Sequence, residues 1–153
     1  EDPLNKRSKE FKGFKTNFLQ FVDHCIREAS ETGDLYDGTL FLSWLEIIST
    51  CSSSKARPLR AAATYMGLQV ITSLVTVVNN LSKSRDLKQN QMDTAMQEKS
   101  CKEMEMLKSL QSAVAECQEQ IEVVEKYMQD VFTQVFTHRF RDCDEAIRAA
   151  CMK

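Results

Sequence analysis

A seam of apolar residues in the last third of the sequence constrains the fold more than any other feature. Apolar side chains recur there by threes and fours over four heptads, with no glycine or proline between them. The seam consists of Leu107, Leu110, Val114, Cys117, Ile121, Val124, Met128, Val131 and Val135. This period predicts one long helix with a narrow apolar stripe and a polar back. Because the stripe is narrow, it requires a single partner helix rather than a broad core.

The partner is expected in the preceding segment, which has a helical pattern from Leu59 onward. Its first half carries a broad apolar face, formed by Leu68, Ile71, Leu74, Val75, Val78 and Leu81. Gly67 lies within this face and predicts a close helix contact. After Leu81 the segment is polar but contains no helix breaker, so we expect the helix to leave the globular body there. The chain would reverse around residues 97–102 and form an antiparallel hairpin.

Two shorter helices are expected ahead of this hairpin. The first carries a stripe that we expect to face the core, made of Phe11, Phe14, Phe18, Phe21, Cys25 and Ala29, widened by Val22 and Ile26. Gly33 suits the left-handed position that ends such a helix. The second helix covers residues 39–51, with Trp44 expected in the core against the phenylalanine stripe. Pro58 fits the first turn of the third helix, where a missing N–H donor costs little.

Residues beyond the seam predict a return to the globular body. Phe132, Phe136 and Phe140 share one helix face at a spacing of four residues. Asp142 or Asp144 is placed to cap a last helix that continues to Lys153. The predicted fold is therefore all-α, a helical-repeat (HEAT-like) body with a protruding antiparallel coiled coil. Its parts are a helical body over 1–81, the hairpin over 82–131, and re-entry with the start of the next repeat over 132–153.

Composition and motifs favour a non-catalytic protein. The chain has 153 residues, enough for one domain, and only four glycines and two prolines. Its six cysteines form no CxxC pair, and His24 and His138 give no ligand spacing, so we expect reduced thiols, no metal site and no cofactor. No phosphate-binding loop, nucleophile elbow or metalloprotease motif occurs, which predicts no catalytic residues and no small-molecule substrate. The longest apolar run, residues 68–78, is too short and too polar to span a membrane.

Several blocks of the sequence resemble the stromal antigen (stromalin, STAG) family of cohesin accessory subunits. Residues 55–64, KARPLRAAAT, with the apolar helix after them, resemble that family's long helix with its Arg-x-x-Arg-x-x-Thr start. Residues 132–142, FTQVFTHRFRD, and 147–149, IRA, are similar to its most specific block, and residues 14–21 to its first helix. Pro58, Leu59 and residues 143–146 depart from the usual pattern, as in a divergent, fungal-type member.

The resemblance implies a setting for the chain. The family's proteins are large helical repeats that bind the kleisin subunit of cohesin and duplex DNA, and that act in sister-chromatid cohesion and chromosome segregation through the cell cycle. It therefore implies a nuclear, chromosome-associated protein of which this chain is an N-terminal portion. The main kleisin groove would lie mostly beyond Lys153, and other cohesin subunits would be partners.

Basic residues form three clusters, which we expect to contact DNA phosphates without reading sequence. They are Lys6, Arg7, Lys9, Lys12, Lys15, Lys55, Arg57, Arg60, Lys83, Arg85 and Lys88. Residues 98–130 carry eight acids and four bases, so the returning arm is not expected to touch phosphate. Arg139 and Arg141 fit either DNA contact or pairing with the nearby aspartates, and we favour the pairing.

Two alternatives stay open at this point. In the first, the chain is a protein-interaction module whose coiled-coil arm docks other cohesin subunits, and the basic clusters have no direct DNA contact. In the second, the seam of residues 107–135 pairs with the same seam of another copy in a homodimer. An acidic back and an exposed helix ahead of the seam favour pairing within one chain.

Overall fold

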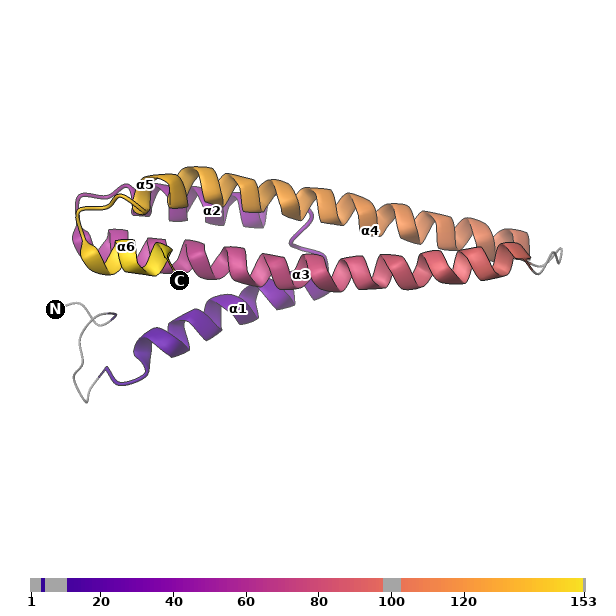
Figure 1. The fold of residues 1–153 in the computed structure, drawn as a ribbon, viewed down its shortest axis with the longest axis horizontal. Coiled ribbons are helices and arrows are strands. Elements are labelled where there is room, and N and C mark those ends of the chain that lie inside the picture. The colour runs from indigo at the N-terminus through magenta and orange to yellow at the C-terminus, as the bar shows by residue number, and fades with distance from the viewer. Residues whose placement is uncertain (1–3, 5–10, 98–102, 153) are drawn as a thin grey trace. The chain divides into compact units, whose positions relative to one another are not determined.

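The computed structural model describes residue 4 and residues 11–97 and 103–152, and these residues form helices without a single strand (Figure 1). The helices are α1 (Phe14–Thr32), α2 (Leu40–Ser52), α3 (Arg57–Gln97), α4 (Glu103–Val131), the π turn η1 (Phe132–Phe136), α5 (Thr137–Arg139) and α6 (Glu145–Cys151). The all-α prediction is thereby confirmed. The expected chain reversal falls almost entirely on residues 98–102, which lie outside the described residues.

The chain divides into two compact units, which are treated separately below. The first unit contains residues 1–74 and 127–153, and the second contains residues 75–126. The second unit overlaps most of the hairpin predicted over 82–131, but the predicted boundaries themselves stay predictions.

The core of the first unit forms where α2, α3 and η1 meet. Gly67 of α3 is the point of closest approach, since a Cβ atom there would lie 3.3 Å from Val135 Cγ1 and 3.5 Å from Ile48 Cγ2. The close helix contact predicted at this glycine is confirmed. Nearby, the ring of Phe41 packs 4.7 Å from that of Tyr127, centroid to centroid. A smaller cluster joins α1, α3 and α6 through Leu4, Leu19, Ala61, Tyr65, Ile147 and Ala150.

The buried face of α1 differs from the predicted one. Val22 and Ile26, expected only to widen the stripe, are fully buried, whereas Phe14 is 43% and Phe21 62% exposed. The phenylalanine stripe is therefore not the core of this unit. Both faces of α1 carry apolar residues, and the tertiary partner, not the helical period, decides which face is covered. The end of α1 follows the prediction, because Gly33 adopts a left-handed φ of 91°.

Two further predictions of burial need the same kind of correction. Trp44 is half-buried and meets the Phe41 ring edge-on, with centroids 6.4 Å apart, instead of packing in the core against the phenylalanine stripe. In the apolar stretch of α3 predicted to face the core, Val70, Leu74 and Val77 are buried, while Val75 is 44% exposed. The apolar face of α3 is thus rotated by about one residue from the predicted face.

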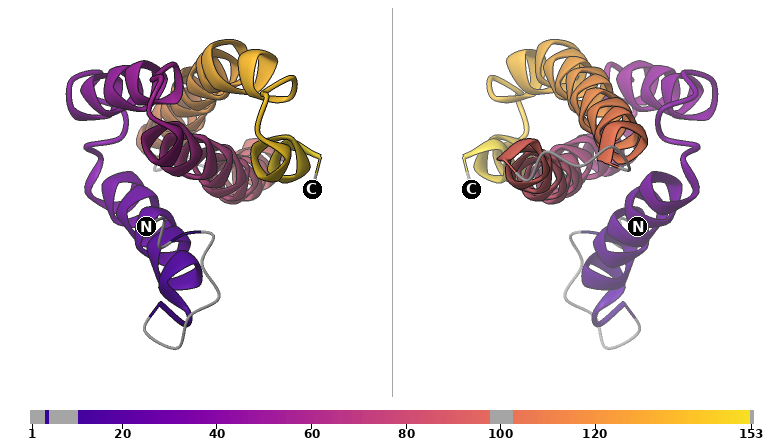
Figure 2. Two further views of the ribbon diagram at one scale, coloured as in Figure 1. Left: turned by 90° about the vertical axis from the view of Figure 1, so that its left-hand side faces the viewer. Right: turned by 90° about the vertical axis from the view of Figure 1, so that its right-hand side faces the viewer.

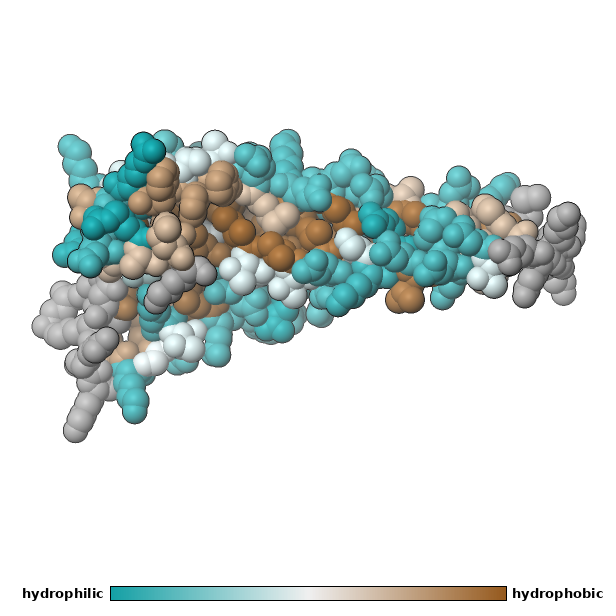
Figure 3. Space-filling view, viewed as in Figure 1, coloured by the Kyte–Doolittle hydropathy of each residue, from teal (hydrophilic) through white to brown (hydrophobic). Residues whose placement is uncertain are grey.

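The second unit consists of the distal parts of α3 and α4, which run side by side in opposite directions (Figures 1 and 2). Cross-helix hydrogen bonds fix the pairing: Arg85 Nη1 donates to Gln118 Oε1 at 2.9 Å, and Lys88 Nζ lies 3.2 Å from Cys117 Sγ. On the face seen in Figure 3, hydrophilic side chains cover most of this unit, and hydrophobic ones show at a few places, some of them between the two helices. The predicted partner of the seam helix is therefore α3. Whether the two helices pack as a regular coiled coil stays a prediction.

Burial along the seam follows the predicted stripe closely. Its buried members are Cys117, Ile121, Val124, Val131 and Val135. Leu107, Leu110, Val114 and Met128 are half-buried, and Tyr127 is buried beside Met128. Among the described residues, α3 contains one stretch long and apolar enough to cross a membrane by composition, but half of that stretch is buried inside the structure, as in the core helix of a globular protein.

After α4 the helix widens into the π turn η1, which carries the aromatic residues predicted to share one face. The rings of Phe132 and Phe136 stack with centroids 4.9 Å apart and planes at 16°. Phe136 and Phe140 stack at 5.8 Å and 11°. The sequence spacing therefore predicted the shared face correctly, although not the π turn itself.

Candidate functional site

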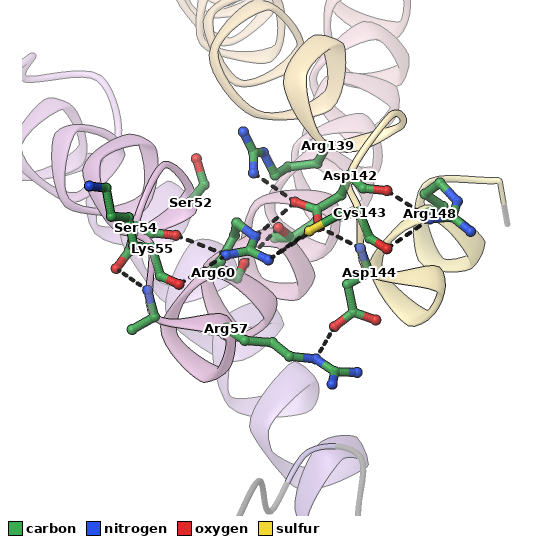
Figure 4. Close-up of polar contacts among 12 residues, drawn as sticks. Ser52, Ser54, Lys55, Arg57, Arg60, Arg139, Asp142, Cys143, Asp144 and Arg148 are labelled. Carbon is green, nitrogen blue, oxygen red and sulfur yellow. Dashed lines mark hydrogen bonds and ion pairs between the residues drawn. The ribbon is translucent and has the colours of Figure 1, made fainter.

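Two of the bases that the sequence marks as functional, Arg57 and Arg60, lie in the first unit at a junction built around the buried carboxylate of Asp142. Its side chain is 2% exposed and lies between the start of α3 and the loop before α6 (Figure 4). Oδ2 accepts from Arg60 Nε at 2.8 Å and from Arg139 Nη1 at 2.7 Å. Oδ1 accepts from the backbone N–H of Asp144 at 2.8 Å. One carboxylate thus ties α3 to α5 and to the next turn of chain, and we call this group the Asp142 junction.

Asp144 extends the Asp142 junction and begins α6. Its Oδ1 accepts from the backbone N–H of Ala146 at 2.9 Å, so Asp144 is the N-cap of α6. Of the two caps left open by the sequence, Asp144 is the one used. Its Oδ2 also pairs with Arg57 Nε of α3. From α6, Arg148 Nη1 donates to the carbonyl oxygens of Asp142 at 2.8 Å and Cys143 at 3.1 Å.

The charges in the junction stabilise one another. Burial raises the pKa of Asp142, but the N–H of Asp144 and the guanidinium of Arg60 outweigh it and hold that pKa at about 2. The hydrogen bond from Arg57 is the main cause that lowers the pKa of Asp144. Hydrogen bonding to Asp142 in turn raises the pKa of Arg60. All of these groups therefore stay charged at neutral pH.

In the first unit, the predicted DNA-contacting residues fall into two groups. Lys12 and Lys55 are exposed, and Arg57 keeps 67% of its side chain exposed although its Nε pairs with Asp144. Lys15 is half-buried, with its ammonium 3.3 Å from the ring centroid of Tyr65, and Arg60 is 11% exposed inside the junction. Lys6, Arg7 and Lys9 lie outside the described residues.

In the second unit, two of the three predicted bases turn toward the partner helix. Arg85 donates to Gln118 and also pairs with Asp86 at 3.0 Å, and Lys88 approaches Cys117. Lys83 is exposed. The basic cluster seen in the sequence therefore acts partly as a set of contacts between helices.

The two arginines left open by the sequence have separate roles. Arg139 pairs with Asp142, with a side chain 17% exposed, which confirms the favoured structural interpretation. Arg141 is exposed and lies with its guanidinium carbon 4.8 Å from the ring centroid of Phe140. Sequence reasoning missed Arg148, which binds two backbone carbonyls. Its position one turn after the Asp144 cap is the signal that would have found it.

The described residues contain no group of three histidine, cysteine or acidic side chains placed to hold a metal ion. An open pocket of about 560 Å³ borders the junction beside Arg57, Arg60 and Cys143. Of the charged residues in its walls, Arg57 pairs with Asp144 and Arg60 pairs with Asp142. The Cys143 thiol lies 3.5 Å from Asp142 Oδ1, but that carboxylate already accepts hydrogen bonds from Arg60, Arg139 and the N–H of Asp144.

Fold and junction together define an all-α protein of the helical-repeat class, in which buried ion pairs join one helix to the next. A family model described as the STAG domain matches residues 1–113, and the chain therefore belongs to the STAG family. It is 35% identical over 153 residues to "Sister-chromatid cohesion protein 3" of Arabidopsis thaliana, covering all of this chain and 14% of that protein. It is 30% identical to "Cohesin subunit SA-1" of Xenopus laevis, covering 99% of this chain and 12% of that protein.

A solved structure supports the same assignment. The cohesin subunit Scc3 from Z. rouxii superposes with a TM-score of 0.85 at 28% identity, covering 96% of this chain and 17% of that one. The chain thus spans about a seventh of the length of the relatives it matches. Identity to the fission-yeast "Cohesin subunit psc3" is 26%, lower than to the plant protein, so the fungal-type subclass stays a prediction.

Proposed function

We propose that this chain is part of a non-catalytic scaffold subunit of cohesin, which supports sister-chromatid cohesion and binds duplex DNA without sequence specificity. Family membership and the names of the relatives support the cohesin role. The setting that follows is nuclear and chromosomal, with the kleisin and other cohesin subunits as partners. Most of the kleisin contact would come from parts of the protein other than this segment.

The DNA proposal rests on one observation, the surplus of exposed positive charge at the start of α3. Lys55 is exposed there, and Arg57 keeps 67% of its side chain exposed while it pairs with Asp144. The other buried aspartate, Asp142, is neutralised by Arg60 and Arg139. The segments that meet at this place carry six bases, Lys55, Arg57, Arg60, Arg139, Arg141 and Arg148, against three acids, Asp142, Asp144 and Glu145. A surplus of positive charge favours the binding of DNA, because the bases replace counterions that are condensed on the phosphate backbone and release them into solution.

The structure refines which residues to test. Lys12, Lys55 and Arg57 are the most suitable phosphate contacts in the first unit, because they are exposed. Arg60 and Lys15 have structural contacts, so their replacement would disturb packing as well as charge. A charge-reversal experiment should therefore use Lys12 and Lys55.

The test is a fluorescence-anisotropy titration of a short labelled DNA duplex with the whole chain at several salt concentrations. We expect binding that weakens steeply with salt, with a slope of about −0.9 on logarithmic axes for each phosphate contacted. The double variant Lys12→Glu/Lys55→Glu should flatten this slope by about 2 and weaken binding to all duplex sequences equally.

A matched control separates local contact from net charge. Lys108 and Lys126 are exposed on α4, and Lys108→Glu/Lys126→Glu changes the total charge by the same amount. Salt-independent binding of the unaltered chain, or equal loss in both double variants, would contradict the proposal.

A second candidate function is a protein-interaction module, and the polar back of α4 favours it. Glu116, Glu119, Glu122 and Glu125 are exposed along this helix, a surface that repels phosphate and suits a basic protein partner. Replacing residues 87–124 with a short linker separates the two ideas. If DNA binding survives while a cohesin partner is lost, the second unit serves protein contacts. If the fold stays intact and DNA binding disappears, this unit helps to hold DNA.

A further inference from the structure

A groove between α1 and α2 in the first unit has no part in the proposed DNA contact. It has a volume of about 320 Å³, and its walls come from the last turns of α1 and the first turns of α2. The lining is mostly apolar and includes Cys25, Ala29, Leu40, Trp44 and Ile47. Asp34 of the loop that joins the two helices also lines the groove.

Large apolar side chains stand exposed at the mouth of this groove. Leu40 is 62% and Ile47 59% exposed. On α1, Phe21 is 62% exposed and precedes Cys25 by four residues, so it continues the same helix line. The aromatic stripe of α1 thus ends in the groove. Contiguous exposed apolar residues of this size mark interaction surfaces more often than they mark neutral surface.

The segment that forms the groove carries a net negative charge, with Asp34 at the rim, and this charge determines the chemistry of the occupant. Asp34 lines the groove directly. Residues 22–47, which supply both walls and the loop, contain six acids, Asp23, Glu28, Glu31, Asp34, Asp37 and Glu46, and a single arginine, Arg27. That arginine already pairs with Asp23 at 2.8 Å. The negative electrostatic potential at the rim therefore attracts cations and repels both DNA phosphates and anionic lipid headgroups.

We propose that this groove docks a short amphipathic segment of a protein partner, with apolar side chains inserted between α1 and α2 and lysine or arginine facing the acidic rim. The volume lies near the lower end of the range for binding pockets, roughly 300–1,000 Å³, so it accommodates side chains of a peptide rather than a folded domain. A hydrophobic groove with charged residues at its edge is the usual arrangement for recognition of an amphipathic helix. This site is separate from the Asp142 junction and from the bases assigned to DNA.

The test selects peptides from a phage-displayed random library on the whole chain, with the Ile47→Glu chain used for counter-selection. Because Ile47 is exposed, its replacement by glutamate changes the groove without unfolding the core. Selected peptides are then synthesised and titrated against the protein. Trp44 is the single tryptophan of the chain and lines the groove, so its fluorescence reports occupancy directly.

We expect the selected peptides to carry apolar residues three or four apart together with lysine or arginine, and to change the Trp44 emission. Ile47→Glu should weaken their binding by at least about tenfold, and Asp34→Lys by about tenfold in a salt-dependent manner. Glu119→Lys, an equal change of charge on an exposed residue of α4, should leave binding unchanged. Enrichment of no peptide over the Ile47→Glu chain, or of acidic peptides, would overturn the proposal. So would sedimentation as a dimer that Ile47→Glu dissociates, because a second copy would then occupy the groove.

Discussion

Removing the negative charge of Asp142, while keeping the size and shape of its side chain, is the most informative single change in this chain. Asp142→Asn leaves Arg60 and Arg139, 11% and 17% exposed, without their shared counter-charge. Breaking a buried ion pair from one side typically costs about 3–5 kcal/mol, because the remaining charge stays buried. The amide oxygen of asparagine can still accept one of the hydrogen bonds, which reduces the expected loss.

The pKa of Asp142 gives an independent magnitude. It falls from 3.8 to about 2 on folding. A shift of this size corresponds to about 2.5 kcal/mol of stability at neutral pH. The two arguments together predict that Asp142→Asn lowers the free energy of unfolding by about 2–4 kcal/mol, a large part of the roughly 5–15 kcal/mol typical of a domain.

Urea denaturation followed by Trp44 fluorescence measures this loss, because Trp44 belongs to the same unit as Asp142. Glu145→Gln is the matched control, since it makes the same acid-to-amide change three residues away at an exposed position. We expect this control to cost about 0.5 kcal/mol, through the lost interaction with the N-terminus of α6. If Asp142→Asn were no more costly than Glu145→Gln, the junction would not hold the helices together and the reasoning would be refuted.

Three further predictions follow from the same unit. Lowering the pH from about 4 to 2 should remove most of the contribution of Asp142 to the free energy of unfolding, because a carboxyl whose pKa is depressed in the folded state loses its stabilisation as it is protonated. Urea denaturation curves of Asp142→Asn should lack that part of the pH dependence. Ile26→Ala should cost about 2–5 kcal/mol and Phe21→Ala under about 1 kcal/mol in urea denaturation, and the reverse order would contradict the observed face of α1. Gly67→Leu should destabilise by about 2 kcal/mol or more, since its side chain meets Val135 and Ile48, and an unchanged denaturation midpoint would argue against that close contact.

Features determined by local spacing could be predicted from the sequence. The seam of α4, the Gly33 terminus and the shared face of the phenylalanines after α4 all depend on residues within a few turns of one another. The cap of α6 was narrowed to two aspartates for the same reason. Period and capping chemistry determine such features whatever the rest of the chain does.

Features that depend on distant partners could not be predicted. The sequence of α1 carries apolar residues on two faces, and only tertiary packing decides that Val22 and Ile26 are buried and Phe21 is not. Asp142 and Arg60 are separated by 82 positions, and no local pattern pairs them. The three basic clusters were visible as charge, but their division into exposed bases and helix contacts depends on tertiary geometry.

The π turn Phe132–Phe136 changes the direction in which the side chains after it leave the helix. Each residue of an α-helix advances the helix by about 100°, and a π turn fits one more residue into its circumference than an α turn does. Arg139 therefore leaves the helix on a different side from the one it would have in an uninterrupted α-helix. Deleting one residue of the π turn would restore a regular helix and rotate Arg139 and Asp142 together, so that Asp142 would turn away from Arg60 of α3. The extra residue thus rotates the side chains that follow it about the helix axis, and this rotation determines which of them face the neighbouring helix α3.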